Sequence, residues 1–395
     1  MATLRRGSSL PDEIVVWEIL VRLPPKSLLR CRAWRRVTSA RDFLLAHHGH
    51  QPSLPIFSGD NPWNLDARYH NILAFDRRAA TEDDQLHAVA MLDQASRLKA
   101  SCDGLLVLSK VTRCGIRLSI CNPATREHAL LGLPWDFGIM GMYLHRPTGE
   151  YRLLLQRRRC NMADLLPEDK LGCYVLSLGS DHRPRYIGWP ETALGIFSMG
   201  GEPVRLHDSL HWCPVYYRIK GKVRWHSKLI VFDTIAESFR QMRKPIVPGH
   251  SYIFEMDGTL GIYTCNRSTK VIDIRVLRDY EREVWDLKYR IELPFAEIRM
   301  QFEGCDDYRK LDVEDCDDYW EFDVFWVDSG VLLLVFPRWL FHVQIDGKLV
   351  NSFYHGRRGL RMCGSWLKQS LVQHTFFPAL EGYVVNASPL IGPVE

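Results

Sequence analysis

A short segment near the start of the chain is apolar on nearly every side of a helix. The charged residues between positions 11 and 23 are Asp12, Glu13, Glu18 and Arg22. The last two are spaced as an i,i+4 ion pair. A surface helix normally keeps a polar back, so a helix apolar nearly all round must be buried on more than one side. We expect this helix to complete its burial against another protein; the alternative is that residues 10–46 pack on the rest of the chain.

Prolines and a serine predict where the helices of this segment begin and end. Pro11 suits the first position of a helix. Pro24 and Pro25 must end that helix, because proline has no N–H to donate and disfavours helical geometry in the residue before it. Ser27 is a suitable cap for a second helix that runs on to Trp34. The pattern therefore predicts a compact unit of short helices.

From about residue 54 onward the pattern changes to short β-type runs divided by turns. A strand and turn followed by a run ending in proline recur, and successive starts lie about 45 to 56 residues apart, the spacing of kelch-like blades. The strands of this pattern start at Ile72, Leu118, Tyr174, Leu229 and Leu340, and a further unit starts at Val284. A fold of regularly spaced short strands is a sandwich, barrel or propeller, and six units favour an all-β propeller of about six blades over residues 54–390.

Acidic turns precede several of the apolar strands. They are Cys102-Asp103-Gly104, His207-Asp208-Ser209, Met256-Asp257-Gly258 and Val327-Asp328-Ser329-Gly330. Aspartate followed by glycine readily takes positive φ, which tight hairpins require. We therefore expect these turns to join neighbouring strands of one blade.

Composition and charge are those of an ordinary globular protein. The chain has 395 residues, of which 46% are hydrophobic and 25% charged, and a net charge of +4. This charge is too small to indicate nucleic acid or a membrane as a partner. An odd number of cysteines, 11, without a C-x-x-C pair indicates reduced thiols, and the N-terminus has no apolar core of a secretory signal. We expect the protein in the cytoplasm, the nucleus or both.

The N-terminal segment resembles an F-box. The family pattern is reproduced at Leu10, Pro11 and Ile14 and continuously from Glu18 to Arg30, with Lys26-Ser27-Leu28-Leu29-Arg30 in the form typical of plants. The resemblance implies binding to a Skp-type adaptor and, through it, to a cullin. By position, the adaptor-binding residues would be Leu10, Pro11, Ile14, Leu20, Leu23, Pro24, Leu28 and Trp34.

The segment departs from the family pattern after Arg30. The chain continues Cys31-Arg32-Ala33-Trp34, four residues shorter than the family, and lacks the usual valine–cysteine pair. Four residues are about 400° of helix, so Trp34 would keep nearly the usual direction but lie one turn early.

The second part resembles the F-box-associated domain of plant F-box proteins. The resemblance rests on Cys102 to Leu106 and on Cys121 to Arg126. It implies a propeller-like domain that holds the substrate. Aromatic residues near expected loops are candidates for a substrate-binding face, namely Trp135, Tyr216, Tyr217 and Trp339.

Together these features predict a small all-α F-box followed by a large all-β domain. The expected units are a flexible tail (1–9), the F-box (10–46), a linker (47–53), the propeller-like domain (54–390) and a C-terminal tail (391–395). We expect the substrate-recognition subunit of an SCF-type ubiquitin ligase. The alternative is a stand-alone binding or carbohydrate-active propeller with a degenerate F-box.

Catalytic motifs are missing from the sequence. It has no phosphate-binding loop, no G-x-S-x-G elbow and no H-E-x-x-H helix. We therefore expect no catalytic residue, no metal site and no cofactor, and a target protein that the sequence does not identify.

Overall fold

The structure is a computed structural model that describes most of the chain. The described residues are 10–59, 69–79, 81, 84–93, 95–113, 115–157, 170–180, 183–188, 202–213, 217–219, 222–224, 228–247, 251–266, 269–303, 322–327, 330–336, 338–355, 360–385 and 390–391.

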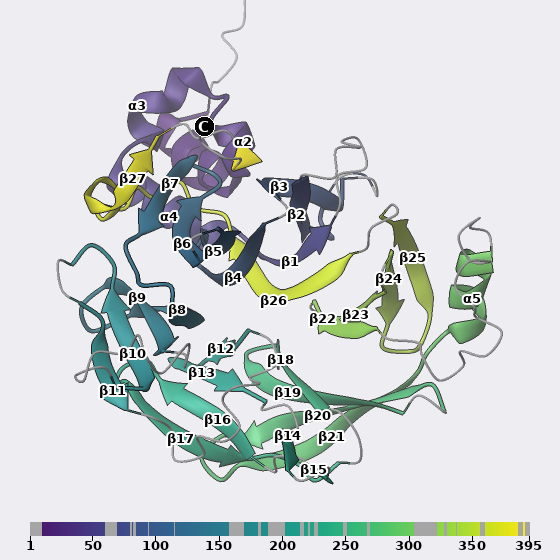
Figure 1. Cartoon of the computed structure of the whole chain (residues 1–395). Coiled ribbons are helices and arrows are strands. Elements are labelled where there is room, and N and C mark those ends of the chain that lie inside the picture. The colour runs from purple at the N-terminus through teal and green to yellow at the C-terminus, as the bar shows by residue number, and fades with distance from the viewer. Residues whose placement is uncertain are drawn as a thin grey trace, which may run out of the picture.

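The molecule is a six-bladed β-propeller with a small group of helices on one face of the ring (Figure 1). Each blade is a sheet of four or five strands in which neighbours along the chain pair antiparallel. The expectation of six blades is confirmed. The strand β26 near the end of the chain lies in the same blade as the first strand, β1.

In every blade the first strand named lies at the centre of the ring and the last strand lies at its outer edge. Blade 1 has the strands β26 (Arg361–Lys368), β1 (Ser53–Gly59), β2 (Tyr69–Phe75), β3 (Leu86–Asp93) and β28 (Leu390–Ile391). Blade 2 has β4 (Ser96–Cys102), β5 (Leu105–Thr112), β6 (Gly115–Asn122), β7 (Glu127–Leu131) and β27 (Glu381–Val384). Blade 3 has β8 (Phe137–His145), β9 (Glu150–Arg157), β10 (Gly172–Ser177) and β11 (Arg185–Gly188).

The remaining blades follow along the chain. Blade 4 has β12 (Val204–Leu206), β13 (Ser209–Trp212), β16 (Lys228–Asp233) and β17 (Ser238–Arg243). Blade 5 has β18 (Ser251–Met256), β19 (Thr259–Asn266), β20 (Val271–Asp279) and β21 (Val284–Glu292). Blade 6 has β22 (Asp323–Trp326), β23 (Val331–Val335), β24 (Trp339–Gln344) and β25 (Leu349–Tyr354). A separate hairpin pairs β14 (Tyr217–Ile219) with β15 (Lys222–Arg224), and the helix α5 (Phe295–Glu303) precedes β22.

The repeat in the sequence corresponds to one strand position in the blades. The repeated segments at Ile72, Leu118, Tyr174, Leu229 and Leu340 all lie in the third strand from the centre, β2, β6, β10, β16 and β24. The unit at Val284 differs, because it begins the fourth strand of blade 5. A buried strand followed by a tight turn is therefore the element that the repeat encodes.

The acidic turns join the innermost strand of a blade to the second strand. Gly104 has a φ of +91° between β4 and β5, and Gly258 has a φ of +78° between β18 and β19. In blade 4, His207 and Asp208 take positive φ at the same place. Such backbone geometry produces a hairpin whose twist matches the strands. The prediction is confirmed for these three turns, while Asp328 and Ser329 lie outside the described residues.

The ring is closed by a strand pair that joins the two ends of the propeller sequence. In it, Ser53 of β1 lies opposite Lys368 of β26, and Pro55 lies opposite Trp366. An open propeller would leave the inner edge of β1 with unpaired backbone groups. The late strand β26 satisfies this edge and becomes the innermost strand of blade 1.

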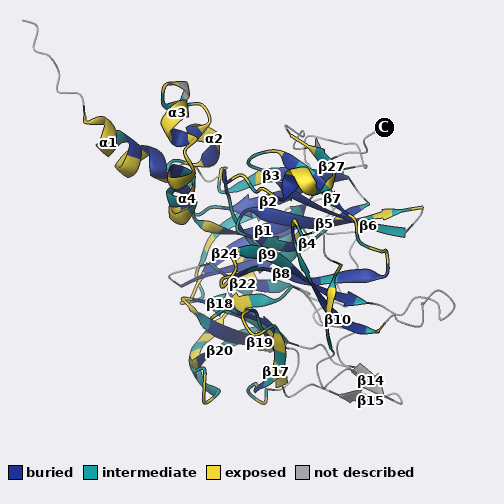
Figure 2. Cartoon of the chain, turned by 90° about the vertical axis from the view of Figure 1, so that its left-hand side faces the viewer, coloured by how far each residue is buried: buried dark blue, intermediate teal, exposed yellow. Residues whose placement is uncertain are grey.

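Short helices precede the propeller and project from one face of the ring (Figures 1 and 2). They are α1 (Asp12–Ile14), the π-helix η1 (Val15–Ile19), the 3-10 helix η2 (Leu20–Arg22), α2 (Pro25–Leu28), the 3-10 helix η3 (Arg32–Trp34), α3 (Arg35–Thr38) and α4 (Arg41–His50). The first three are continuous, so the apolar segment forms one helical stretch of changing width. Another short 3-10 helix, η7 (Phe377–Ala379), follows β26.

The ends of two helices differ from the sequence predictions. Pro11 takes the cap position, and the first helical residue is Asp12. The second helix begins at Pro25 with Pro24 as its cap, so Ser27 lies inside the helix and does not cap it. Proline can occupy the first turn because its missing N–H has no partner there. The expected linker at 47–53 is mostly helical, since α4 continues to His50 and β1 begins at Ser53.

Candidate docking surface and central channel

The N-terminal helices share one buried apolar cluster. Leu20, Leu28 and Phe43 are 5%, 3% and 1% exposed and pack together with Val16. Leu371, from the segment after β26, contributes to the same cluster. The helices are therefore held to the propeller as well as to one another.

A buried histidine and a buried glutamine fix the turn between the first two helices. His47 Nε2 and Gln51 Nε2 lie 2.8 Å and 3.1 Å from the carbonyl oxygen of Leu23 and donate to it. Burial lowers the pKa of His47, and its hydrogen bond to Leu23 opposes this only in part. His47 is therefore neutral near pH 7, and α4 clamps the carbonyl that precedes Pro24.

Several large apolar side chains at the N-terminus remain exposed after this packing. We call Leu10, Ile14, Trp17 and Ile19 the N-terminal apolar group; their exposed fractions are 57%, 43%, 46% and 43%. The Trp17 ring also touches the cluster, with its centroid 5.8 Å from that of Phe43. Glu18 and Arg22 form the expected ion pair at 2.9 Å. The part of the helical stretch that its own chain leaves open is thus mostly apolar.

The structure divides the predicted adaptor-binding residues into three sets. Leu10, Pro11, Ile14 and Pro24 are exposed, Leu23 and Trp34 are half-buried, and Leu20 and Leu28 are buried in the helical cluster. Trp17 and Ile19 were not among the predicted residues, although the apolar character of every side of the helix was the signal that could have found them.

Polar contacts join α4 to the segment that follows β26. Lys368 Nζ donates to the carbonyl oxygen of Gly49 at 3.2 Å, and His48 Nδ1 lies 3.4 Å from the carbonyl oxygen of Gln369. Asn122 Nδ2 donates to the carbonyl oxygen of Ser370 at 3.0 Å. The helices therefore sit where the ring closes, beside blades 1 and 2.

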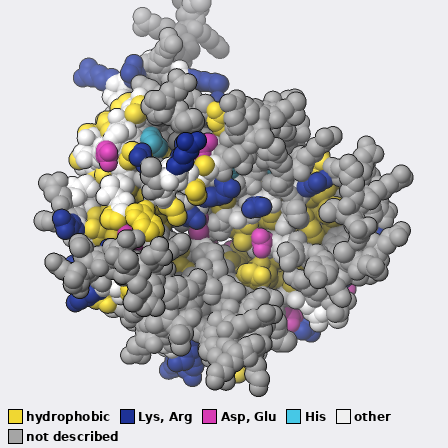
Figure 3. Space-filling model, in the orientation of Figure 1, with side chains coloured by type: hydrophobic (Ala, Val, Ile, Leu, Met, Phe, Trp, Pro, Cys, Tyr) yellow, Lys and Arg dark blue, Asp and Glu magenta, His cyan; other side chains and the backbone are white. Residues whose placement is uncertain are grey.

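A cavity of about 1100 Å³ lies at the centre of the ring. Its walls come from the innermost strands of all six blades, and Figure 3 shows the hollow bordered by hydrophobic and charged side chains. We call this cavity the central channel. A hollow of this size, lined by both aromatic and charged residues, is typical of a binding site.

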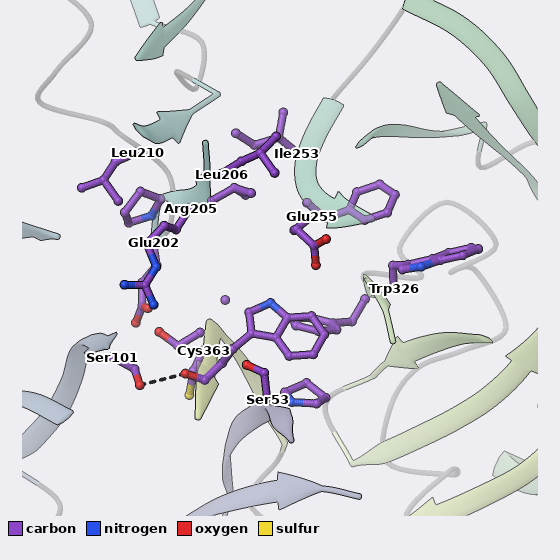
Figure 4. Close-up of a pocket in the computed structure, with 18 of the residues that line it drawn as sticks. Ser53, Ser101, Glu202, Arg205, Leu206, Leu210, Ile253, Glu255, Trp326 and Cys363 are labelled. Atoms are coloured by element: carbon purple, nitrogen blue, oxygen red, sulfur yellow. Dashed lines mark hydrogen bonds between the residues drawn. The ribbon is translucent and has the colours of Figure 1, made fainter. Parts of the chain in front are cut away.

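Two acidic residues and a cysteine face the central channel (Figure 4). Glu202 lies just before β12, Glu255 is on β18, and Cys363 is on β26. Burial raises the pKa of the Glu202 carboxyl to about 8, although Lys99 attracts its negative charge. Burial and the nearby Glu202 raise the pKa of the Cys363 thiol, so that thiol is protonated and unreactive near neutral pH.

The aromatic residues predicted to bind a substrate do not come together. Trp135 is exposed on a turn before β8, whereas Trp339 is 8% exposed and stacks on Phe341 with ring centroids 5.6 Å apart. Tyr216 lies outside the described residues, and Tyr217 begins β14 with a side chain that is not described. None of these four residues lines the central channel, which the sequence pattern did not reveal.

The described ranges also bear on metal binding and on membrane insertion. Within them, no group of three histidine, cysteine or acidic side chains is placed to hold a metal ion. No helix described in the structure combines the length and apolar content needed to cross a bilayer.

Comparison with known proteins gives one distant relative by sequence. No protein-family model matches the chain. The chain is 23% identical over 305 residues to a protein of Arabidopsis thaliana named "Putative F-box protein", covering 73% of this chain and 74% of that protein.

Solved structures resemble the chain only loosely. TolB from Acinetobacter baumannii has a TM-score of 0.45 and 10% identity, over 82% of this chain and 70% of that protein. A protein of unknown function from Bacteroides caccae has a TM-score of 0.37 and 10% identity, over 77% and 94%. The chain is thus a six-bladed propeller with a distant sequence relationship to a protein described as an F-box protein.

Proposed function

We propose that this chain is the substrate-recognition subunit of an SCF-type ubiquitin ligase. The N-terminal helices bind a Skp-type adaptor and through it a cullin, and the propeller holds a target protein. The observation that carries the proposal is the N-terminal apolar group, which stays exposed beside a complete helical cluster. The distant F-box relative agrees with it.

The energetics favour a protein partner for this group. Complete burial of a side chain such as Ile14 is worth about 1.5–3 kcal/mol. Ile14 and Trp17 are three residues apart on the helical stretch, so one apolar partner surface can cover both. The Glu18–Arg22 pair is exposed on the same stretch and can border such an interface without being buried.

In this proposal the chain carries out no chemistry itself. It acts by proximity, because a target held near the ubiquitin carrier has a high effective concentration of reacting groups. The cytoplasm and the nucleus are the compartments in which this role would be exercised.

The test measures adaptor binding by variants of the N-terminal apolar group. We expect the purified chain to bind a recombinant plant Skp-type adaptor in isothermal titration calorimetry. Ile14→Asp should weaken binding at least tenfold, because a charge would be buried in the interface. Leu287→Asp is the matched control, since Leu287 is 49% exposed on β21 in blade 5. Leu20 is unsuitable, because aspartate inside the cluster would disrupt the helices themselves.

Two results would contradict the proposal. One is a folded wild-type chain with no measurable adaptor binding, which would favour a stand-alone propeller. The other is an Ile14→Asp variant that binds as tightly as the wild type.

A further inference from the structure

The charged groups that line the central channel are unevenly paired. Arg205 Nη2 lies 3.3 Å from Asp103 Oδ1, and Arg146 Nε lies 2.8 Å from Asp208 Oδ1, so these cations already have carboxylate partners. Among the described residues, Glu202 has no ion pair.

Glu255, on the neighbouring blade, has no cationic partner in the described part of the chain either. One of its oxygens accepts a hydrogen bond from the backbone N–H of Gly258 at 2.6 Å. Figure 4 shows the carboxyl groups of Glu202 and Glu255 on different sides of the cavity. The channel therefore offers acceptor oxygens to a ligand from more than one direction.

A glycine on the innermost strand of blade 1 leaves room beside Glu202. Gly364 has a φ of +69°, and a Cβ atom placed on it would lie 3.5 Å from Cβ of Glu202. A side chain at this position would be strained and would narrow the space next to the carboxyl group. The neighbouring Cys363 thiol is protonated, so it adds no charge there.

The surroundings of Glu202 oppose its ionisation. Burial dominates and raises the pKa of its carboxyl to about 8, while Lys99 on β4 pulls in the other direction. Arg205, on β12, is engaged by Asp103 and by Cys102 Sγ, which lies 2.8 Å from Arg205 Nη1. A buried carboxylate without a hydrogen-bonded partner is costly, so a donor that enters the channel relieves this cost.

Aromatic rings supply the second half of the site. Trp366 on β26 is half-buried and lines the channel, and Tyr252 on β18 lines it with 44% of its surface exposed. The faces of such rings attract cations, and a planar guanidinium group stacks on them more readily than an ammonium group does. A guanidinium group also presents paired N–H donors that match a carboxylate.

We propose that the central channel binds the guanidinium group of an arginine side chain presented by a target protein. Glu202 accepts its hydrogen bonds, and the aromatic wall packs against its plane. This inference rests on the proposed receptor role, for which it names the chemistry of the target.

Binding of a cation to ionised Glu202 releases the proton that the empty channel retains. Affinity should therefore rise with pH while the free carboxyl is being deprotonated and level off above that range. Lys99, Cys363 and Arg205 are the titratable or charged neighbours of Glu202. Arginine, lysine and the buried thiol keep their protonation between pH 6.5 and 8.5, so Glu202 dominates this pH dependence.

The experiment titrates the full chain with short capped peptides in ligand-observed NMR and calorimetry. The probe is acetyl-Gly-Arg-Gly-amide, and the matched peptide contains citrulline, which has the same shape without the charge. Glu202→Gln tests the acceptor, and Glu281→Gln, on the exposed turn between β20 and β21, is the control. Thermal unfolding verifies that each variant is folded.

The expected result is saturable binding of the arginine peptide that Glu202→Gln weakens at least tenfold and Glu281→Gln leaves unchanged. Affinity of the wild type should rise about eightfold between pH 6.5 and 7.5, as release of one proton requires. Equal binding of the citrulline peptide, equal binding by folded Glu202→Gln, or no saturable binding would overturn the inference. If Glu202→Gln does not fold, the comparison of the two peptides on the wild type decides.

Two further arms separate the possible sources of the ligand and of a failure. Methylguanidinium alone should bind more weakly than the peptide; equal affinity would indicate a free guanidine and overturn the assignment to a target side chain. Adaptor binding is measured on the same preparation. Adaptor binding without arginine binding refutes this inference alone, whereas a lack of adaptor binding refutes the proposed function.

Discussion

At the scale of single residues, two glycines in equivalent turns separate backbone strain from steric collision. Gly104 and Gly258 both have positive φ in the turn after the innermost strand. A Cβ on Gly104 would lie 2.7 Å from Cβ of Ser370 and 2.8 Å from the carbonyl oxygen of Lys368, whereas a Cβ on Gly258 would meet open space. The turn at Gly104 therefore carries the segment that holds the helices.

We expect Gly258→Ala to lower the free energy of unfolding by about 1–2 kcal/mol, from backbone strain alone. Gly104→Ala should lower it by about 3 kcal/mol or more, because overpacking adds to the strain. Urea unfolding measures both. Equal losses for the two variants would show that the contact with Ser370 does not constrain the turn.

Sequence reasoning identified the turn glycines but not the acceptor in the channel. An aspartate–glycine pair carries its backbone geometry locally, so its role can be read from neighbouring letters. Glu202 is one glutamate among many in the sequence, and its properties come from burial by other blades. Leu20 and Leu28 show the same limit, since a leucine that faces a partner and one that faces its own helices look alike.

At the scale of elements, α4 organises the helices before it. Gln51 is 7% exposed and its amide shares the Leu23 carbonyl with His47. The carbonyl lies at the end of the helical stretch that carries the N-terminal apolar group. Loss of the amide should loosen that stretch.

We expect Gln51→Met, which keeps the side-chain volume, to cost about 1 kcal/mol. Backbone amides between residues 12 and 23 should exchange with deuterium faster in this variant, as measured by mass spectrometry. Gln344→Met, at an exposed position at the end of β24, is the control and should change neither quantity. Unchanged exchange in Gln51→Met would show that the cluster alone positions the helices.

The helix α4 was not predicted as an element that anchors others. Its histidines at 47, 48 and 50 gave the appearance of a polar, solvated end, yet His47 is fully buried. The strands were predicted better, because their apolar runs and turns repeat six times and each copy supports the others. A single short helix has no such repetition.

At the scale of the whole molecule, buried histidines in separate parts of the fold predict a common acid sensitivity. Burial lowers the pKa of His70, His211 and His374 from 6.5 to about 4, and it lowers that of His47. The unfolded chain therefore binds more protons than the folded chain between these values. Stability is complete above pH 6.5 and is lost as pH falls toward 4.

We expect the melting temperature to fall steadily between pH 6.5 and 5. For His211, whose pKa falls from 6.5 to about 4 on folding, the loss over this interval is about 2 kcal/mol. His211→Gln should flatten the dependence, whereas His50→Gln, at an exposed position, should leave it unchanged. A melting temperature that is constant from pH 7.5 to 5 would contradict the prediction.

The strand that closes the ring, β26, has a consequence for how the protein is made. Lys368 follows Gly49 by 319 residues, so β1 must wait through the synthesis of five blades before its partner strand emerges from the ribosome. Until then its inner edge is open to wrong partners, and the channel wall formed by Cys363 and Gly364 does not exist. A nascent chain is therefore exposed to aggregation and has no finished receptor, and chaperone dependence should end only when this late strand is translated.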